Sequence, residues 1–347
     1  MNTPPDDRHA WQRRGTFEVA PDVFRIPLPL PGDGLAAVNV YAILQTDGVV
    51  LIDAGWALGE ARTHLGSGLA AIDRDLGSIR RVLVTHLHRD HFEQAVHLQR
   101  EFGARVDLGD GERASLEDLL ASPSPDRSPM MDRLRQAGAT PLVVQLEELR
   151  RRLEEAGAVD HPSWSLPDHW LHDGEVIVLE DRRLTARHTP GHTQGHLVFV
   201  DHAAGVLFSG DHVLPHITPS IGLEQLPVES SLADYLASLA LVRGMDDLQM
   251  LPAHGPVRAT IHDRIDELFV HHAQRLQASA KAVADGNLTA YEVARALPWT
   301  RHARVFDELD PFNRMLAVNE TAAHLDVLVR RAELGVVEVD GVRHYTT

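Results

Sequence analysis

Metal-ligand side chains follow directly after an apolar strand in residues 82–91, which read VLVTHLHRDH. Three histidines and one aspartate fall within the last six of these residues. Burying several imidazoles side by side is costly, because each must be desolvated and the charged forms repel one another. His86 and His88 lie two residues apart in extended backbone, so both rings point to the same side and can bind one metal ion. Asp90 and His91 begin the following helix and turn toward a second position, so the spacing indicates a metal site.

Three later segments each place one metal-ligand residue just after a short apolar run. His192 lies in TPGHT, Asp211 in FSGDH and His254 in PAHG. Binding residues collect in the loops at one rim of a sheet scaffold. Each of these segments alone is a weak signal, because such short motifs are common. All three, in this order after residues 82–91, indicate one shared site.

These motifs resemble the metallo-β-lactamase-fold superfamily, in which H-x-H-x-D-H is followed by a lone His, a lone Asp and a last His. The resemblance covers roughly residues 20–258. It implies an α/β fold, an αββα sandwich with the metals at one edge between the sheets. It also implies a set of metal ligands: His86, His88 and His192 for the first metal, Asp90, His91 and His254 for the second, Asp211 as the bridge, and Asp53 in the segment LIDAG as a residue that supports the ligands.

The implied ligand set favours zinc and a hydrolytic reaction. Cysteine is absent, so every metal ligand must be His, Asp or Glu. Imidazoles and carboxylates suit borderline divalent metals, zinc first, and iron and manganese are also compatible. Two such ions can share a hydroxide that attacks a polarised carbonyl or phosphoryl centre, and Asp90, beside that water, could also shuttle its proton. We therefore expect a dinuclear metal-dependent hydrolase with two divalent ions per chain, acting on an ester, thioester or lactone.

Two alternative functions are left open by the motifs. One is an endoribonuclease of the same fold, because the β-lactamase-like subgroup with a winged-helix tail includes RNA-cleaving members. The other is a metal-sensing winged-helix regulator. Both require nucleic acid as a partner, and the formal net charge of −17 repels phosphate backbones. A zinc β-lactamase of the best-known kind is disfavoured too, because it uses a cysteine in the second metal site.

The chain of 347 residues is long enough for one large domain with an appendage, or for two domains. Apolar runs and turns typical of short strands fill most of the first 258 residues, but residues 104–175 break this rhythm and predict a helical insertion. Beyond residue 260, three helical patterns precede an Asp-Gly hairpin signal, an order typical of a winged helix. We expect a catalytic domain over 1–259 and a winged-helix-like domain over 260–347 that acts as a lid or dimerisation module.

Other residues have weaker assignments. His216, near Asp211, could face the substrate, although a purely polar role in its loop is an equal alternative. Tyr235 is expected to pack, and His271 with His272 to lie on a solvated helix face. No secretory signal and no membrane-spanning apolar stretch is evident. We therefore expect a cytoplasmic protein with a small-molecule substrate and no membrane partner, for which a homo-oligomer is a compatible state.

Overall fold

Two β-sheets packed face to face form the centre of the computed structural model, which describes residues 9–30, 34–121, 129–157, 162–226, 228–300 and 303–347. The first sheet has the order β1-β2-β3-β4-β5-β6-β7, with β1 Phe17–Ala20, β2 Val23–Pro29, β3 Ala37–Gln45, β4 Gly48–Ile52, β5 Ile79–Leu83, β6 Arg105–Gly109 and β7 His169–Leu171. The second has the order β12-β11-β10-β9-β8, with β8 Val176–Val178, β9 Arg183–His188, β10 Leu197–Asp201, β11 Val206–Gly210 and β12 Gln249–Pro252. Residues 1–8, where a secretory signal would begin, lie outside the described residues.

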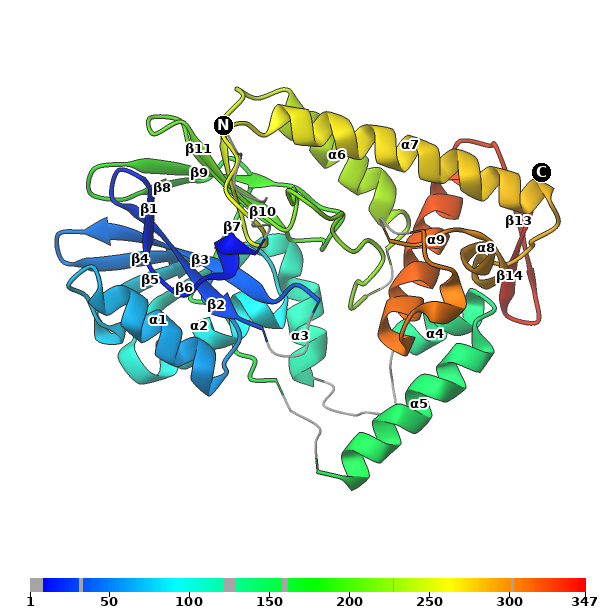
Figure 1. The fold of residues 1–347 in the computed structure, drawn as a ribbon, viewed down its shortest axis with the longest axis horizontal. Coiled ribbons are helices and arrows are strands. Elements are labelled where there is room, and N and C mark those ends of the chain that lie inside the picture. Colours follow the sequence, from blue (N-terminus) through cyan, green and yellow to red (C-terminus); the bar gives the residue numbers. More distant parts are fainter. Residues whose placement is uncertain (1–8, 31–33, 122–128, 158–161, 227, 301–302) are drawn as a thin grey trace, which may run out of the picture.

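Helices cover the outer face of each sheet, so the layers follow the predicted αββα order (Figure 1). On the first sheet lie α1 (Gly59–Ala70), α2 (Arg89–Phe102) and α3 (Arg113–Ala121), and on the second lie α6 (Ser231–Arg243) and α7 (His262–Ala284). Three apolar clusters fill the layers. Leu65 and Phe92 pack with Val82 outside the first sheet, Ile43 packs with Phe199 between the sheets, and Leu239 packs with Val200 outside the second.

The strand directions bring several loops to one edge of the sandwich. In the first sheet β4, β5 and β6 run parallel to one another. In the second, β9 and β11 both run antiparallel to β10, and β12 runs parallel to β11. The carboxyl ends of β9, β11 and β12 therefore point the same way. The segments with His192, Asp211 and His254 follow these three strands, and the segment of residues 86–91 follows β5 of the first sheet.

The predicted helical insertion over 104–175 is wrong at both of its ends. Strands β6 and β7 occupy those ends and pair in parallel with each other, which extends the first sheet. The helical part is α3 together with α4 (Pro129–Gln136) and α5 (Thr140–Glu155). The β6 strand reads RVDLG, and its fully buried Asp107 is neutralised by Arg81 and Arg105. A charged residue inside a short strand hides the strand from pattern analysis.

The C-terminal region has the predicted order of three helices followed by a hairpin: α7, α8 (Ala290–Ala296), α9 (Pro311–Arg330), β13 (Gly335–Val339) and β14 (Val342–Thr346). Helix α9 lies between α7 and the helices α4 and α5 of the insertion (Figure 1). Leu142 of α5 and Leu325 of α9 belong to the same apolar cluster as Val200 of the second sheet. The insertion and the tail thus share one core with the second sheet. Among the described helices, none is long and apolar enough to cross a membrane.

His272 departs from its predicted position on a solvated helix face. The side chain is 1 % exposed, and its Nδ1 lies 3.1 Å from Nε2 of His324 on α9. Its ring also contacts the ring of Tyr235 on α6. The prediction was wrong because α7 is covered by both α6 and α9, which the sequence of α7 alone does not reveal.

Candidate metal centre

Seven side chains from both sheets converge at the edge described above. The segment after β5 brings His86 and His88, and α2 begins directly after His88 and carries Asp90 and His91 in its first turn. The loops after β9, β11 and β12 bring the other three residues, His192, Asp211 and His254. All seven are the residues that the sequence singled out. They lie in two groups, and within each group the potential ligand atoms are within 4.8 Å of one another.

The first group consists of His86, His88, His192 and Asp211. The Nε2 atom of His192 lies 3.2 Å from Nε2 of His86 and 3.1 Å from Nδ1 of His88. Those two atoms of His86 and His88 are themselves 2.9 Å apart. Three ring nitrogens at this separation surround one point, which is the geometry that a single ion with nitrogen ligands requires.

The second group consists of Asp90, His91 and His254. Oδ2 of Asp90 lies 3.6 Å from Nε2 of His91 and 3.4 Å from Nε2 of His254. All three residues are largely or wholly buried. The two Nε2 atoms have no hydrogen-bond partner, so both are available to a ligand placed between them and Asp90.

Asp211 faces both groups through different oxygens. Its Oδ2 lies 3.5 Å from Nε2 of His192, whereas its Oδ1 lies 3.4 Å from Nε2 of His254 and 3.8 Å from Nε2 of His91. Oδ1 is buried without a hydrogen-bond partner. An unpartnered buried carboxylate oxygen beside two unpartnered imidazole nitrogens fits a cation, because a buried charge needs a compensating partner. The residues present therefore suit a divalent metal, and the donor set is compatible with zinc.

Hydrogen bonds from Nδ1 fix the orientation of three rings. Nδ1 of His91 donates to Oδ2 of Asp53 at 2.8 Å. Nδ1 of His254 donates to the carbonyl of Ala37 at 2.8 Å, and Nδ1 of His192 donates to the carbonyl of Ser220 at 2.8 Å. Since a carbonyl or carboxylate oxygen only accepts, Nδ1 carries the proton in each ring. In the neutral form of each ring, Nε2 then presents its lone pair to the centre, as metal binding requires.

Asp53 occupies the supporting position that the resemblance implied. It follows β4 in a left-handed backbone conformation with φ of 60°. Its Oδ1 accepts hydrogen bonds from both the backbone N–H and the hydroxyl of Thr85, at 2.8 and 3.0 Å. The hydroxyl of Thr85 lies 3.0 Å from Nδ1 of His86. Asp53 therefore contacts one ligand of the second group directly and reaches the first group through Thr85.

The electrostatics of the two groups differ. In the first group, burial and the neighbouring imidazoles lower the pKa of His88 to about 3, and burial lowers the pKa of His192 to about 4. Both rings are neutral at pH 7 and can act as ligands. In the second group, burial lowers the pKa of His91, but Asp90, Asp53 and Asp211 outweigh it and raise the pKa to about 10. Without a metal, a proton on His91 balances these carboxylates, which indicates a cavity built for positive charge.

Glu112 is a supporting residue that the sequence did not reveal. It lies in a 3-10 turn (Asp110–Glu112) after β6 and is 1 % exposed. Its Oε1 accepts from the backbone N–H of Leu87 and from the hydroxyl of Thr193. Leu87 separates His86 from His88 in the sequence, and Thr193 follows His192. Glu112 thus joins the two loops that carry the imidazoles of the first group.

The side chains of Asn39 and His196 also hold the ligand loops, through hydrogen bonds to the backbone of these loops, and these contacts too escaped sequence analysis. The amide of Asn39 on β3 donates to the carbonyls of Pro252 and Gly255, on either side of His254 in the sequence. The backbone N–H of Asp211 donates to Nε2 of His196 at 3.2 Å. His196 follows a glycine, and this GH dipeptide could have drawn attention to it. Backbone carbonyls, in contrast, leave no signature in a sequence.

The remaining predicted residues lie outside the two groups. His216 is exposed in the loop after Asp211, so its role toward a substrate stays a prediction. Tyr235 is fully buried and donates to the carbonyl of His212 at 3.0 Å, which confirms its packing role. Trp164 of the segment that returns from the insertion stacks on Phe92 of α2, with ring centroids 6.0 Å apart.

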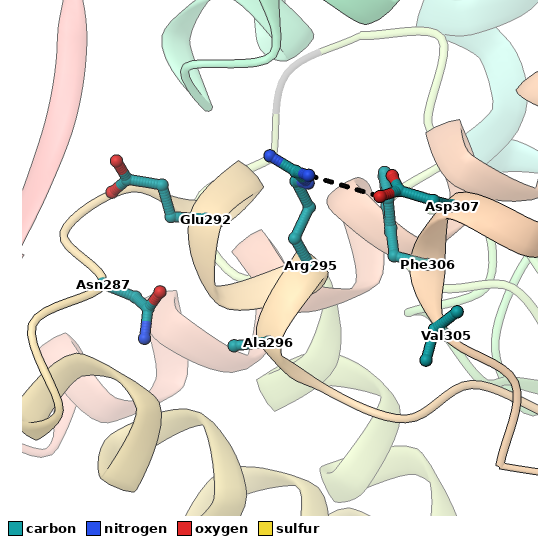
Figure 2. Close-up of a pocket in the computed structure, with 7 residues that line it drawn as sticks. All are labelled: Asn287, Glu292, Arg295, Ala296, Val305, Phe306 and Asp307. Carbon is teal, nitrogen blue, oxygen red and sulfur yellow. Dashed lines mark hydrogen bonds and ion pairs between the residues drawn. The ribbon is translucent and has the colours of Figure 1, made fainter.

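A surface pocket of about 260 Å³ lies in the tail, away from the metal-ligand residues. Figure 2 shows it between α8 and the segment that precedes α9. Arg295 and Asp307 face each other across it, with Nη2 and Oδ2 3.3 Å apart. None of the predicted site residues lines this pocket, so it is not part of the candidate centre.

Comparison with known proteins agrees with this fold and site. Residues 33–254 match the family model of the metallo-beta-lactamase superfamily. A metallo-beta-lactamase family protein from Thermus thermophilus superposes with a TM-score of 0.74 at 25% identity, covering 95% of this chain and 99% of that one. A beta-lactamase domain protein from Burkholderia ambifaria gives a TM-score of 0.76 at 29% identity, covering 95% and 94%. The chain therefore belongs to the metallo-β-lactamase superfamily, and it is a metal-dependent hydrolase of that superfamily.

Curated relatives carry hydrolase names. The probable metallo-hydrolase YqjP of Bacillus subtilis is 26% identical over 326 residues, covering 88% of this chain and 92% of the relative. The lactamase-like protein nscB of Neosartorya fischeri is 28% identical over 173 residues, which is 44% of this chain and only 50% of the relative. An atrochrysone carboxyl ACP thioesterase of Aspergillus terreus is 27% identical over 158 residues, covering 40% and 46%.

Proposed function

We propose that the chain is a dinuclear hydrolase that cleaves an ester, thioester or lactone with two divalent metal ions, zinc first among the candidates. The observation that carries this proposal is the placement of Asp211, whose Oδ2 faces the first group and whose Oδ1 faces the second. One carboxylate shared between two sets of imidazoles supports two neighbouring ions. Two ions bound in this way supply a hydroxide nucleophile near neutral pH and polarise the substrate oxygen that is attacked.

The protein side chains have distinct tasks in this proposal. Neutral His86, His88 and His192 would supply lone pairs to an ion in the first group without adding charge, which would leave that ion electrophilic. The pKa of Asp90 is far below its ordinary value, because His91 and His254 outweigh the effect of its burial. Asp90 is therefore a carboxylate at neutral pH, as a metal ligand has to be. Its place in the second group, beside the position of the attacking water, is what would let it receive a proton. We propose Asp90 as both a ligand and the proton acceptor.

Among the three substrate classes, a thioester is the first to test. The name of the Aspergillus terreus relative, a thioesterase, supports this choice, although that alignment spans less than half of either chain. The absence of cysteine excludes a thiolate nucleophile of the protein's own. A nucleophile drawn from water is consistent with the hydrolysis of all three classes.

The two nucleic-acid functions have less support. In a winged helix, the helix before the hairpin is the one that would enter a groove, and here that helix is α9. Ten of its residues are buried, and α4, α5, α6, α7 and α8 all pack against it. A helix covered in this way cannot lie in a groove without dissociation of its neighbours. Together with the net charge of −17, this favours a small-molecule substrate.

The test is a metal and substrate assay on the full chain. We expect elemental analysis after zinc supplementation to find two ions per chain. We expect hydrolysis of a panel of acyl thioesters, lactones and aryl esters, with a rate that rises with pH as the attacking water ionises, near pH ~7. Asp246→Asn, an exposed aspartate, serves as a control. Cleavage of a short RNA without turnover of any acyl substrate would overturn the proposal in favour of the nuclease.

A further inference from the structure

The loop of residues 211–226, here called the Asp211 loop, connects the metal-ligand residue Asp211 to the tail and the insertion. It begins at the end of β11 and, through the carbonyl of Ser220, accepts the hydrogen bond from Nδ1 of His192 at 2.8 Å. One loop therefore contributes the shared carboxylate and also orients a histidine of the first group. Its conformation decides where Nε2 of His192 points.

Arg264 of α7 holds the first half of this loop. Its Nε donates to the carbonyl of Leu214 at 2.7 Å, and its Nη2 donates to the carbonyl of Ile217 at 2.8 Å. Its Nη1 donates to Glu267 on the same helix at 2.8 Å, and the side chain is only 12 % exposed. A guanidinium presents its donors in a rigid fork. Two carbonyls that are three residues apart are thus fixed relative to α7.

Two further contacts hold the second half of the loop. Arg133 of α4 donates to the carbonyls of Glu224 and Leu226. Gly222 has a φ of 86°, and a Cβ atom there would lie 3.0 Å from the carbonyl oxygen of Asn319 on α9. The loop therefore lies directly on the backbone of α9. Ser220 lies between the segment that Arg264 holds and the segment that rests on α9 and Arg133.

We propose that Arg264 is a positioning residue for the first metal group: by fixing the Asp211 loop, it holds the Ser220 carbonyl where it orients His192. The proposal rests on the metal site proposed above. It assigns the tail a role beyond covering the catalytic region, because α7 supplies the guanidinium and α9 supplies the surface on which the loop rests. The first group of ligands is then complete only when the tail is docked.

The experiment titrates the metal-free full chain with Co²⁺ and follows binding by absorption. His192→Ala and His254→Ala are titrated in the same way, as references for the first and the second metal position. One Co²⁺ equivalent is lost in His192→Ala, and we expect this equivalent to bind at least ~10-fold more weakly in Arg264→Met. The affinity of the other Co²⁺ equivalent should not change. Arg264→Lys keeps the charge but not the planar guanidinium. Its Co²⁺ affinity for the first group should lie between that of Arg264→Met and that of the wild type. Arg243→Met is the matched control, because Arg243 joins α6 to Asp266 of α7 without a hydrogen bond to the loop.

Hydrogen exchange of the metal-free chain provides a second measurement that does not depend on the ion. Peptides covering 213–226 should exchange faster in Arg264→Met and at the wild-type rate in Arg243→Met. Gly222→Ala, which pushes the loop off α9, should reproduce the selective loss if Arg264→Met does not fold. Unchanged affinity of both equivalents, with or without faster exchange, would overturn the inference. A wild-type chain that binds no Co²⁺ would overturn the proposed function as well.

Discussion

Nδ1 of His91 donates to Oδ2 of Asp53 over 2.8 Å, and both side chains are almost completely buried. Asp53 follows a strand of the first sheet, whereas His91 lies in the first turn of α2. The bond therefore joins the strand edge to the helix and sets which nitrogen of His91 faces the second group. The bond orients His91 within that group, as the carbonyl of Ala37 orients His254.

Asp53→Asn should weaken metal binding chiefly at the second group. The amide keeps the size of the side chain but loses the negative charge that holds the Nδ1 proton of His91, and losses of about 10–100-fold in affinity are typical of such supporting residues. Competition titration with a chromophoric chelator measures both equivalents. Asp107→Asn is the control, because Asp107 is equally buried but pairs with Arg81 and Arg105. Equal weakening in both variants would mean that Asp53 contributes only to stability.

Asp211→Ala should reduce the occupancy of both metal positions, whereas His254→Ala should chiefly reduce that of the second. The reason is that Asp211 presents one oxygen to each group, whereas Nε2 of His254 faces Asp90 and Oδ1 of Asp211. Elemental analysis after gel filtration gives the number of ions retained. Retention of one full equivalent in Asp211→Ala would contradict a shared carboxylate.

Glu112→Ala should weaken the first group more than Glu112→Gln does. Glutamine can still accept the hydrogen bonds of Leu87 and Thr193 through its amide oxygen, whereas alanine leaves both buried donors without a partner. The measurement is the Co²⁺ affinity of each equivalent together with the unfolding midpoint. A comparable loss of affinity in both variants would show that the charge of Glu112 matters more than its hydrogen bonds.

Glu224 should make the metal-free chain less stable as the pH rises. Burial, together with the carboxylate of Glu112, raises the pKa of Glu224 to about 8 from an ordinary value of 4.5. Between these pH values the folded chain holds a proton that the unfolded chain has released, so the free energy of unfolding falls with increasing pH. Urea unfolding at several pH values should show a flatter dependence for Glu224→Gln. The exposed Glu117→Gln should keep the wild-type slope, and identical slopes for all three proteins would refute the prediction.

The tail should not bind nucleic acid with useful affinity. Its helix α9 is covered, and the hairpin β13–β14 carries Arg343, which pairs with Asp326 at 2.6 Å. Titration of the full chain against duplex DNA and single-stranded RNA should show no binding at moderate salt. Micromolar binding with a steep salt dependence would instead favour the nuclease.

The candidate ligand residues stand out in the sequence because they are clustered and follow apolar strands. His86, His88 and Asp90 fall close together in one segment, and the order of His192, Asp211 and His254 after them completes the pattern. Parallel and antiparallel pairing then brings these strand ends together, as the structure shows. The division at residue 259 stays a prediction, because the tail shares its core with the second sheet.

The features that escaped prediction have a common physical origin in long-range packing. The carbonyls of Ser220 and Ala37 orient two ligand rings, yet any residue at those positions could supply a carbonyl. Glu112 is one of 50 acidic residues, and only burial between two loops distinguishes it. Strand β7 is three residues long, too short for a pattern to show.

The candidate ligand residues lie far apart in the sequence, so the ribosome synthesises them at different times. His254 follows His86 by 168 positions, and Arg264 and the α9 surface come after it. A nascent chain that has released only its first sheet presents three imidazoles and one carboxylate in residues 82–91 without their partners. If the chain binds the two ions proposed above, their stable uptake has to wait until Arg264 and the α9 surface have been synthesised and have folded onto the ligand loops.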